Sequence, residues 1–217
     1  KKSKKRMKIF DKKRNKMEGL YDPRNEHDSC GLGFIANIKG RKSNDIVKKG
    51  IFILENLEHR GATGADPLVG DGAGMLTQIP HEMYREEMEK LSCFLPDLGG
   101  YGVGMFFFPK EVKYHMLIKG IIVKLSEEQG IKLLGWRDIP VNNECLSKDE
   151  EIREAEPIHV QGFFKKPEGM SENDFERNLY VLRKKTTNKI YKELGSEELY
   201  YAVSLSSRTV VYKGMFL

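Results

Sequence analysis

The sequence is short of cysteine, tryptophan and long hydrophobic runs, and each shortage excludes a class of protein. Three cysteines among 217 residues, with no Cys-x-x-Cys pair, indicate neither a disulfide framework nor a zinc site. No run of 18 uncharged apolar residues occurs, so we expect no membrane partner. The first sixteen residues lack the apolar core of a secretory signal, which predicts a cytoplasmic or organellar location and argues against secretion.

The net charge of +5 is concentrated in an N-terminal tail, where residues 1–16 contain ten Lys or Arg and one acid. Such a tail could bind nucleic acid by releasing counterions from phosphates. Only Phe10 supplies an aromatic ring in residues 1–20, and we favour a disordered, solvated extension over a nucleic-acid arm. With 39% apolar residues, the rest of the chain can build one substantial core.

Apolar spacing predicts an interleaved series of strands and helices. The predicted strands are 30–38, 75–79, 101–108, 131–136, 158–164, 200–206 and 209–212. The predicted helices are 45–59, 81–91, 112–129, a short one opened by Ser147 before Pro157, and a long one between Ser171 and Gly195. The mixed order indicates an α+β fold with sheet packed against helices, and Ser207-Arg208 is expected to turn the last two strands into a hairpin.

The residue spacing argues against two kinds of site, a phosphate-binding loop and a metal site. The glycines in 70–74 and 100–104 match neither dinucleotide nor P-loop templates, so we interpret them as tight turns and close strand approaches. His59, Asp66, Asp71 and His81 match no metal-ligand spacing, and we expect no metal in this segment.

Cys30 is the candidate nucleophile. A cysteine in a strand is usually a small buried hydrophobe. Here the polar or small residues 25–31 give way abruptly to the predicted strand, which places Cys30 at an exposed strand opening.

Five ordered blocks then resemble the glutamate synthase family, at its class II glutamine amidotransferase domain. The first block runs from Tyr21-Asp22-Pro23 to Cys30-Gly31-Leu32-Gly33-Phe34, and the second from Leu57-Glu58-His59-Arg60-Gly61-Ala62 to Gly70-Asp71-Gly72-Ala73-Gly74. The other three are 135–141, 175–180 and 204–215, so the resemblance extends from about Tyr21 to Leu217.

The resemblance implies an αββα sandwich of the N-terminal-nucleophile hydrolase type, incomplete at its C-terminus. It makes residues 1–29 a leader that is removed and residues 30–217 the first part of the amidotransferase domain. Cys30 is then the nucleophile, with its own α-amine as base, and Arg60 and Gly31 are supporting residues. The glutamine-binding residues are expected beyond Leu217, so this segment alone is expected to be inactive.

The same resemblance implies L-glutamine as substrate and a synthase domain of the same polypeptide as partner, with a homo-oligomer left open. FMN, a 3Fe-4S cluster and NAD(P)H are implied for the full enzyme, and no cofactor for this segment. Two alternatives stay open. One is another class II amidotransferase, of the amidophosphoribosyl or glucosamine-phosphate type. The other is a noncatalytic anion-binding domain anchored by the basic tail.

Overall fold

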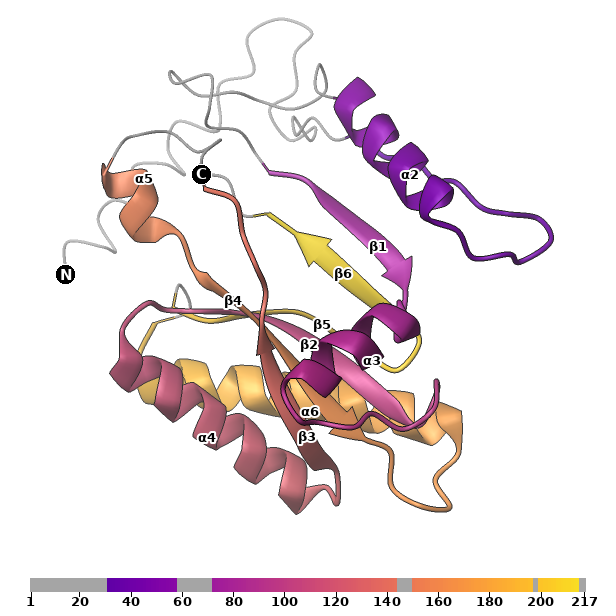
Figure 1. Cartoon of the computed structure of the whole chain (residues 1–217). Helices are drawn as coiled ribbons and strands as arrows, with labels where there is room; N and C mark the ends of the chain where they lie inside the picture. The colour runs from indigo at the N-terminus through magenta and orange to yellow at the C-terminus, as the bar shows by residue number, and fades with distance from the viewer. Residues whose placement is uncertain (1–30, 58–71, 144–149, 197–198, 215–217) are drawn as a thin grey trace, which may run out of the picture.

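The computed structural model of the chain describes residues 31–57, 72–143, 150–196 and 199–214. Within these ranges the helices are α2 (Asn44–Asn56), α3 (His81–Lys90), α4 (Val112–Glu128), α5 (Glu150–Ala155) and α6 (Glu172–Leu194). The strands are β1 (Gly74–Gln78), β2 (Tyr101–Phe108), β3 (Lys132–Asp138), β4 (Ile158–Lys165), β5 (Tyr201–Ser206) and β6 (Thr209–Lys213). The predicted α+β class is confirmed (Figure 1).

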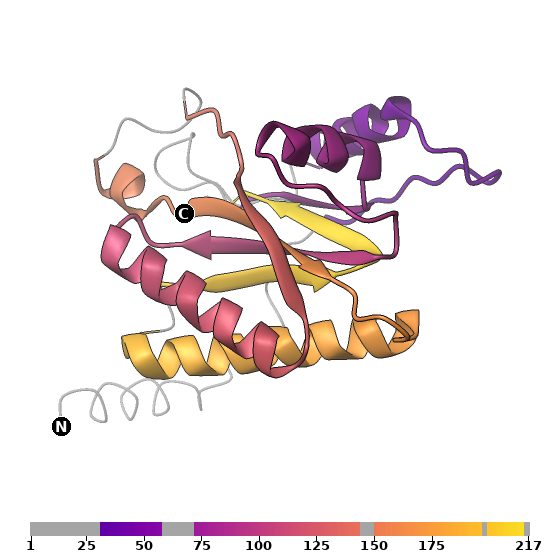
Figure 2. The same cartoon turned by 60° about the horizontal axis from the view of Figure 1, so that its bottom comes forward.

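Four strands form the central sheet, in the order β3-β4-β2-β5, and every neighbouring pair is antiparallel. The chain order β2-α4-β3-α5-β4-α6-β5, in which the short helix α5 lies in the β3–β4 connection, gives this sheet the split β-α-β arrangement. Helices α4 and α6 lie side by side over one face (Figure 2). The opposite face is therefore left for other elements of the chain.

That opposite face carries a two-stranded antiparallel ribbon of β1 and β6, called the ribbon below. Strand β6 packs against β2 and β5, and α3 and α2 lie on the same side of the central sheet as the ribbon (Figure 2). The molecule is thus layered as helices, a four-stranded sheet, and a ribbon with helices beside it.

Strand β2 is buried on both faces, as its nearly continuous apolar sequence predicts. Phe106 and Phe108 point into the core under α4 and α6, whereas Met105 and Phe107 point into the core under α3 and the ribbon. Two cores share this one strand, and burial of each large side chain contributes about 1.5–3 kcal/mol. Strand β2 therefore contributes side chains to both cores.

Helix α6 has the ends that its sequence predicts. The Ser171 side chain accepts a hydrogen bond from the backbone N–H of Asp174 at 3.1 Å, which satisfies a free donor of the first turn. Gly195 adopts φ +67°, the left-handed conformation that ends a helix at little cost for glycine. The other helices begin within one residue of their predicted starts, except that the predicted Ser147 cap of α5 lies outside the described residues.

The predicted hairpin of the last two strands is wrong, although both strands exist. Strand β5 pairs with β2 in the central sheet, while β6 crosses to the ribbon and pairs with β1. The carboxylate of Glu176 on α6 accepts hydrogen bonds from Ser206 Oγ and from the N–H and Oγ of Ser207. These bonds satisfy the backbone at the crossing, so no hairpin turn is needed there.

The predicted strand at 30–38 is also wrong for its described part, because residues 31–37 form no strand. Leu32 and Phe34 are 92% and 91% exposed, and neither of the two described sheets includes this segment. An alternating apolar pattern makes a strand only when a sheet edge is available to it. The predicted helix at 45–59 is confirmed as α2, although it buries no side chain completely.

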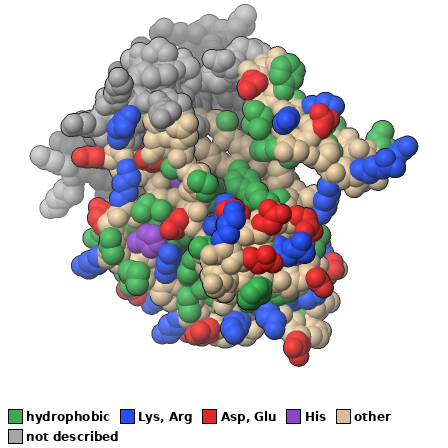
Figure 3. Space-filling model, in the orientation of Figure 1, with side chains coloured by type: hydrophobic (Ala, Val, Ile, Leu, Met, Phe, Trp, Pro, Cys, Tyr) green, Lys and Arg blue, Asp and Glu red, His purple; other side chains and the backbone are tan. Residues whose placement is uncertain are grey.

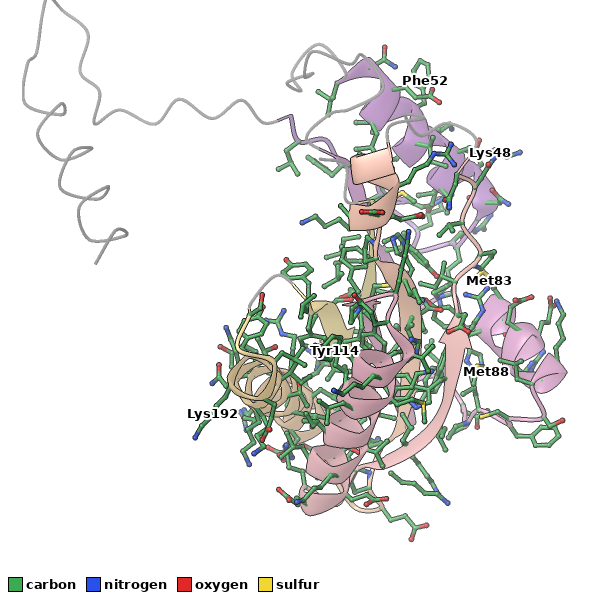
Figure 4. All side chains as sticks on the ribbon, turned by 90° about the vertical axis from the view of Figure 1, so that its left-hand side faces the viewer. Lys48, Phe52, Met83, Met88, Tyr114 and Lys192 are labelled. Carbon is green, nitrogen blue, oxygen red and sulfur yellow. The ribbon has the colours of Figure 1, made fainter. Side chains whose placement is uncertain are left out.

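Helix α2 stands out from the body of the molecule, and Lys48 and Phe52 project from it (Figure 4). Hydrophobic side chains also reach the surface over the ribbon, where Leu76 is 64% exposed (Figure 3). None of the described helices is both long and apolar enough to cross a membrane.

Candidate active site

The segment that follows Cys30 lies against helix α2. Cys30 and Arg60 fall outside the described residues, whereas Gly31 is described. A Cβ built at Gly31 would lie 3.0 Å from Leu57 Cδ2, and one built at Gly33 would lie 2.3 Å from Ile53 Cγ2. The backbone at both glycines thus approaches the last turn of α2 closely.

A pocket of about 310 Å³ opens between α2, the ribbon and the end of β3. It is lined mainly by apolar side chains, among them Leu54 of α2, Met75 of β1 and Ile139 after β3. Leu54 and Leu57 are three residues apart, so they lie on one face of α2. The pocket and the backbone of Gly31 thus adjoin the same helical face.

Three polar residues, His159, Tyr212 and Lys213, also line this pocket. Burial lowers the pKa of His159, with a smaller opposing effect from Glu156, so the ring is neutral at physiological pH. Its ring centroid lies 4.7 Å from that of Phe107, which fixes the imidazole against the sheet. The pocket therefore combines an apolar wall with a neutral imidazole, while the Lys213 ammonium lies over the Tyr201 ring, 5.1 Å from its centroid.

Behind the pocket lies a set of hydrogen-bonded side chains, here called the buried network: Glu87, Arg137, Gln161, Tyr84 and Tyr212. Arg137 donates through Nη2 to Glu87 Oε2 and through Nη1 to Gln161 Oε1, both at 3.0 Å. Gln161 Nε2 donates to the hydroxyl of Tyr84 at 2.9 Å and to that of Tyr212 at 3.3 Å. The two hydroxyls are 2.8 Å apart.

The chemistry of the network fixes its directions. A guanidinium only donates, so Gln161 must present its oxygen to Arg137 and its NH₂ to the tyrosines. Tyr84 is fully buried, and among the described residues Tyr212 is the one acceptor for its proton. Burial, reinforced by Tyr212, raises the pKa of Tyr84, which keeps that proton in place. Tyr212 then accepts from both neighbours.

Sequence reasoning did not find this network. Its one local signal is a polar residue, Gln161, inside the otherwise buried strand β4. Of the residues weighed as metal ligands, His59, Asp66 and Asp71 lie outside the described residues. His81 is hydrogen-bonded through Nδ1 to the hydroxyl of Tyr101 at 3.0 Å. The described part of the chain contains no group of three or more His, Cys, Asp or Glu placed to hold a metal ion.

Residues 30–217 match the family model described as "Glutamine amidotransferases class-II". The chain therefore belongs to the class II glutamine amidotransferases. It is 42% identical over 202 residues to the glutamate synthase [NADPH] large chain of Bacillus subtilis, covering 92% of this chain and 13% of that one. Identity is 39% to the glutamate synthase [NADH] of Schizosaccharomyces pombe, covering 92% of this chain and 9% of that one.

Identity is 36% to the ferredoxin-dependent glutamate synthase 2, chloroplastic, of Arabidopsis thaliana, over 90% of this chain and 12% of that one. The chain thus spans about a tenth of the length of these relatives. These proteins are named for three different electron donors, so the similarity does not select a donor for this chain.

Proposed function

We propose that this chain is the glutaminase part of a glutamate synthase, which hydrolyses L-glutamine to glutamate and ammonia. The observation that carries the proposal is the family match, which starts at Cys30, together with relatives that are glutamate synthases. The ammonia would pass to a synthase domain of the same polypeptide, where 2-oxoglutarate is reductively aminated to a second glutamate. The compartment stays a prediction.

In this proposal the leader, residues 1–29, is removed and Cys30 becomes the first residue. Its free α-amine, with an ordinary pKa of about 7.7–8.0, takes the proton of a thiol with a pKa of about 8.5. The thiolate then forms a bond to the side-chain carbonyl carbon of glutamine. The C–N bond breaks and ammonia leaves with the transferred proton. Water hydrolyses the thioester, which releases glutamate and restores the thiol.

The described residues support this role by fixing the position of the residue that follows Cys30. Gly31 rests on Leu57, and a Cβ at position 31 would lie only 3.0 Å from Leu57 Cδ2. Arg60 is proposed to support the same region. The groups that bind the glutamine carboxylate and the oxyanion are proposed to lie after Leu217, which is why the segment alone is expected to be inactive.

We extend the proposal to the fold. A sheet covered by α4 and α6 with the ribbon on its other face supplies three layers of an αββα sandwich. The exposed Leu32 and Phe34 and the fully solvated Ile38 support a further sheet edge that would cover them. That edge would come from a later part of the polypeptide.

FMN, a 3Fe-4S cluster and NAD(P)H belong in this proposal to other parts of the full enzyme. The described residues include one cysteine, Cys93, and no clustered metal ligands, so they do not fit an iron–sulfur cluster. No step of the glutaminase reaction is assigned to these groups here.

The test is a pair of activities measured on the full-length enzyme. Cys30→Ala should abolish glutamate synthesis from glutamine and leave synthesis from added ammonia intact, because the synthase site does not use the thiol. Cys93→Ala is the matched control and should retain both activities. Retained glutamine-dependent synthesis in Cys30→Ala would reject the proposed nucleophile, and equal loss of both activities would indicate damaged folding.

A further inference from the structure

We infer that the buried network is a positioning device for the nucleophile, acting through the ribbon and helix α2; this inference rests on the proposed role of Cys30. The network joins four elements that are distant in sequence. Tyr84 and Glu87 lie on α3, Arg137 on β3, Gln161 on β4 and Tyr212 on β6. It therefore fixes the ribbon to the central sheet at one point.

A continuous series of contacts leads from that point toward Cys30. Tyr212 is the direct cross-strand partner of Met75 in the ribbon. Met75 Sδ lies 3.0 Å from the position that a Cβ would take at Gly50, so β1 is in close contact with α2. On the same helix, Leu57 lies against Gly31, the residue bonded to Cys30. Moving Tyr212 would thus move the surface on which Gly31 rests.

Helix α2 has little else to hold it in place. None of its side chains is completely buried, and its close contacts include Gly31, Gly33 and Met75 of the ribbon. A helix with few buried apolar contacts opens or shifts at low free energy unless its neighbour is rigid. The network supplies that rigidity, because Gln161 is completely buried and Arg137 nearly so.

The direction of the hydrogen bonds strengthens this interpretation. Arg137 orients Gln161, and Gln161 and Tyr84 both donate to Tyr212. The Tyr212 oxygen is thus held by two donors, one from the sheet and one from α3. Removing this oxygen leaves the aromatic ring and the pairing with Met75 intact, yet it frees the ribbon from both partners.

The experiment uses the full-length mature enzyme with Tyr212→Phe. Tyr101→Phe is the control, since Tyr101 belongs to the same core, where it is more deeply buried than Tyr212, and loses one hydrogen bond, to His81. Four quantities are measured: kcat for glutamine, KM for glutamine, the rate at which a glutamine-mimicking electrophile modifies Cys30, and amide hydrogen exchange in 44–56 and 74–78.

In Tyr212→Phe we expect kcat and the modification rate to fall by roughly tenfold to a hundredfold, as small misplacements of a nucleophile do, with KM changed little. Exchange in both segments should speed up, while synthesis from ammonia stays the same. Tyr101→Phe should change none of these. Unchanged kcat in Tyr212→Phe, or equal losses in both variants, would overturn the inference.

A second variant tests whether the residues act as one unit. Gln161→Met keeps the length of the side chain and removes its hydrogen bonds, and the double variant with Tyr212→Phe should be slowed no more than the worse single variant. Independent, multiplying losses would overturn the network as a unit. If Cys30 is not the nucleophile, the hydrogen-exchange rates still test whether the network holds α2 and the ribbon in place. Unchanged exchange in 44–56 and 74–78 would reject that role.

Discussion

The hydroxyl oxygens of Tyr84 on α3 and Tyr212 on β6 lie 2.8 Å apart although 128 residues separate them in the chain. Gln161 donates to both, so the contact joins three segments that share no local sequence pattern. Because hydroxyls buried this way lose most of their water, they are stable only with a full set of partners. The pair therefore marks a point at which the fold is fixed by specific bonds in addition to apolar packing.

The mature enzyme should begin at Cys30, because a cysteine inside the chain has no free α-amine to serve as base. N-terminal sequencing of the purified full-length protein measures this directly. A variant blocked in processing, which retains Asp28 and Ser29, should lose glutamine-dependent synthesis and keep ammonia-dependent synthesis. An active protein that still carries those two residues would contradict the expectation.

Cys93 should react slowly with thiol reagents in the folded protein. Burial raises the pKa of its thiol, and its Sγ is hydrogen-bonded to the carbonyl oxygen of Leu134 at 3.3 Å. The thiolate is the reactive form, so little of it is available. Mass spectrometry after treatment with a glutamine-mimicking electrophile should find the adduct on Cys30.

The control is the same reagent on the enzyme unfolded in urea, where Cys93 and Cys145 should become as accessible as any free thiol. Preferential labelling of either residue in the native enzyme would remove Cys30 from its proposed role.

Two glycine substitutions should have opposite effects on the free energy of unfolding. Gly33→Ala places a Cβ 2.3 Å from Ile53 Cγ2, so the Ile53 side chain or α2 must move, and overpacking of this kind costs about 1–3 kcal/mol. Gly120→Ala is the matched control at an exposed position of α4, where nothing lies within 4 Å of the added atom. It should stabilise the helix by about 0.5–1 kcal/mol. Denaturant titration of both variants gives the comparison, and equal midpoints would show that α2 is not packed on Gly33.

The stability of the domain should fall as the medium becomes acidic. Burial lowers the pKa of His159, and burial together with Lys119 lowers that of His115. The unfolded chain then binds more protons than the folded one below the ordinary histidine pKa of about 6.5. The stabilisation is complete above this pH and is lost as the pH falls through the lowered folded-state values.

Unfolding free energies measured between about pH 5 and pH 7.5 should therefore rise with pH, and His159→Asn should flatten that rise without removing the part due to His115. An unchanged slope in the variant would mean that His159 is protonated equally in both states.

Local patterns in the sequence were enough to predict most elements. Strand β2 could be bounded correctly because it is apolar on both faces, and α6 because Ser171 and Gly195 mark its ends. The pairing of the strands was harder to predict, because two strands that are adjacent in sequence usually pair, which favours a hairpin between β5 and β6. The carboxylate of Glu176 binds the connection between β5 and β6, and it lies on a helix about 30 residues earlier in the chain. No local sequence pattern indicates that contact.

The candidate site also has one part that local sequence could suggest and one part that it could not. Cys30 could be singled out from its motif, and its role stays a prediction because it lies outside the described residues. The buried network could not, since its bonds depend on how α3, β3, β4 and β6 converge. The apolar residues of 32–38 suggested a strand, and in the described structure Leu32, Phe34 and Ile38 are exposed instead.

The pairing of β1 with β6 has a consequence for synthesis on the ribosome. Strand β1 emerges first, and every other strand of the described fold and four of the helices are made before its partner β6 is complete. At ordinary translation rates that interval is on the order of ten seconds. During it the five residues of β1 carry unsatisfied backbone groups in a crowded cell. Their shortness, and the proline two residues after Gln78, limit the chance that another chain pairs with them before β6 arrives.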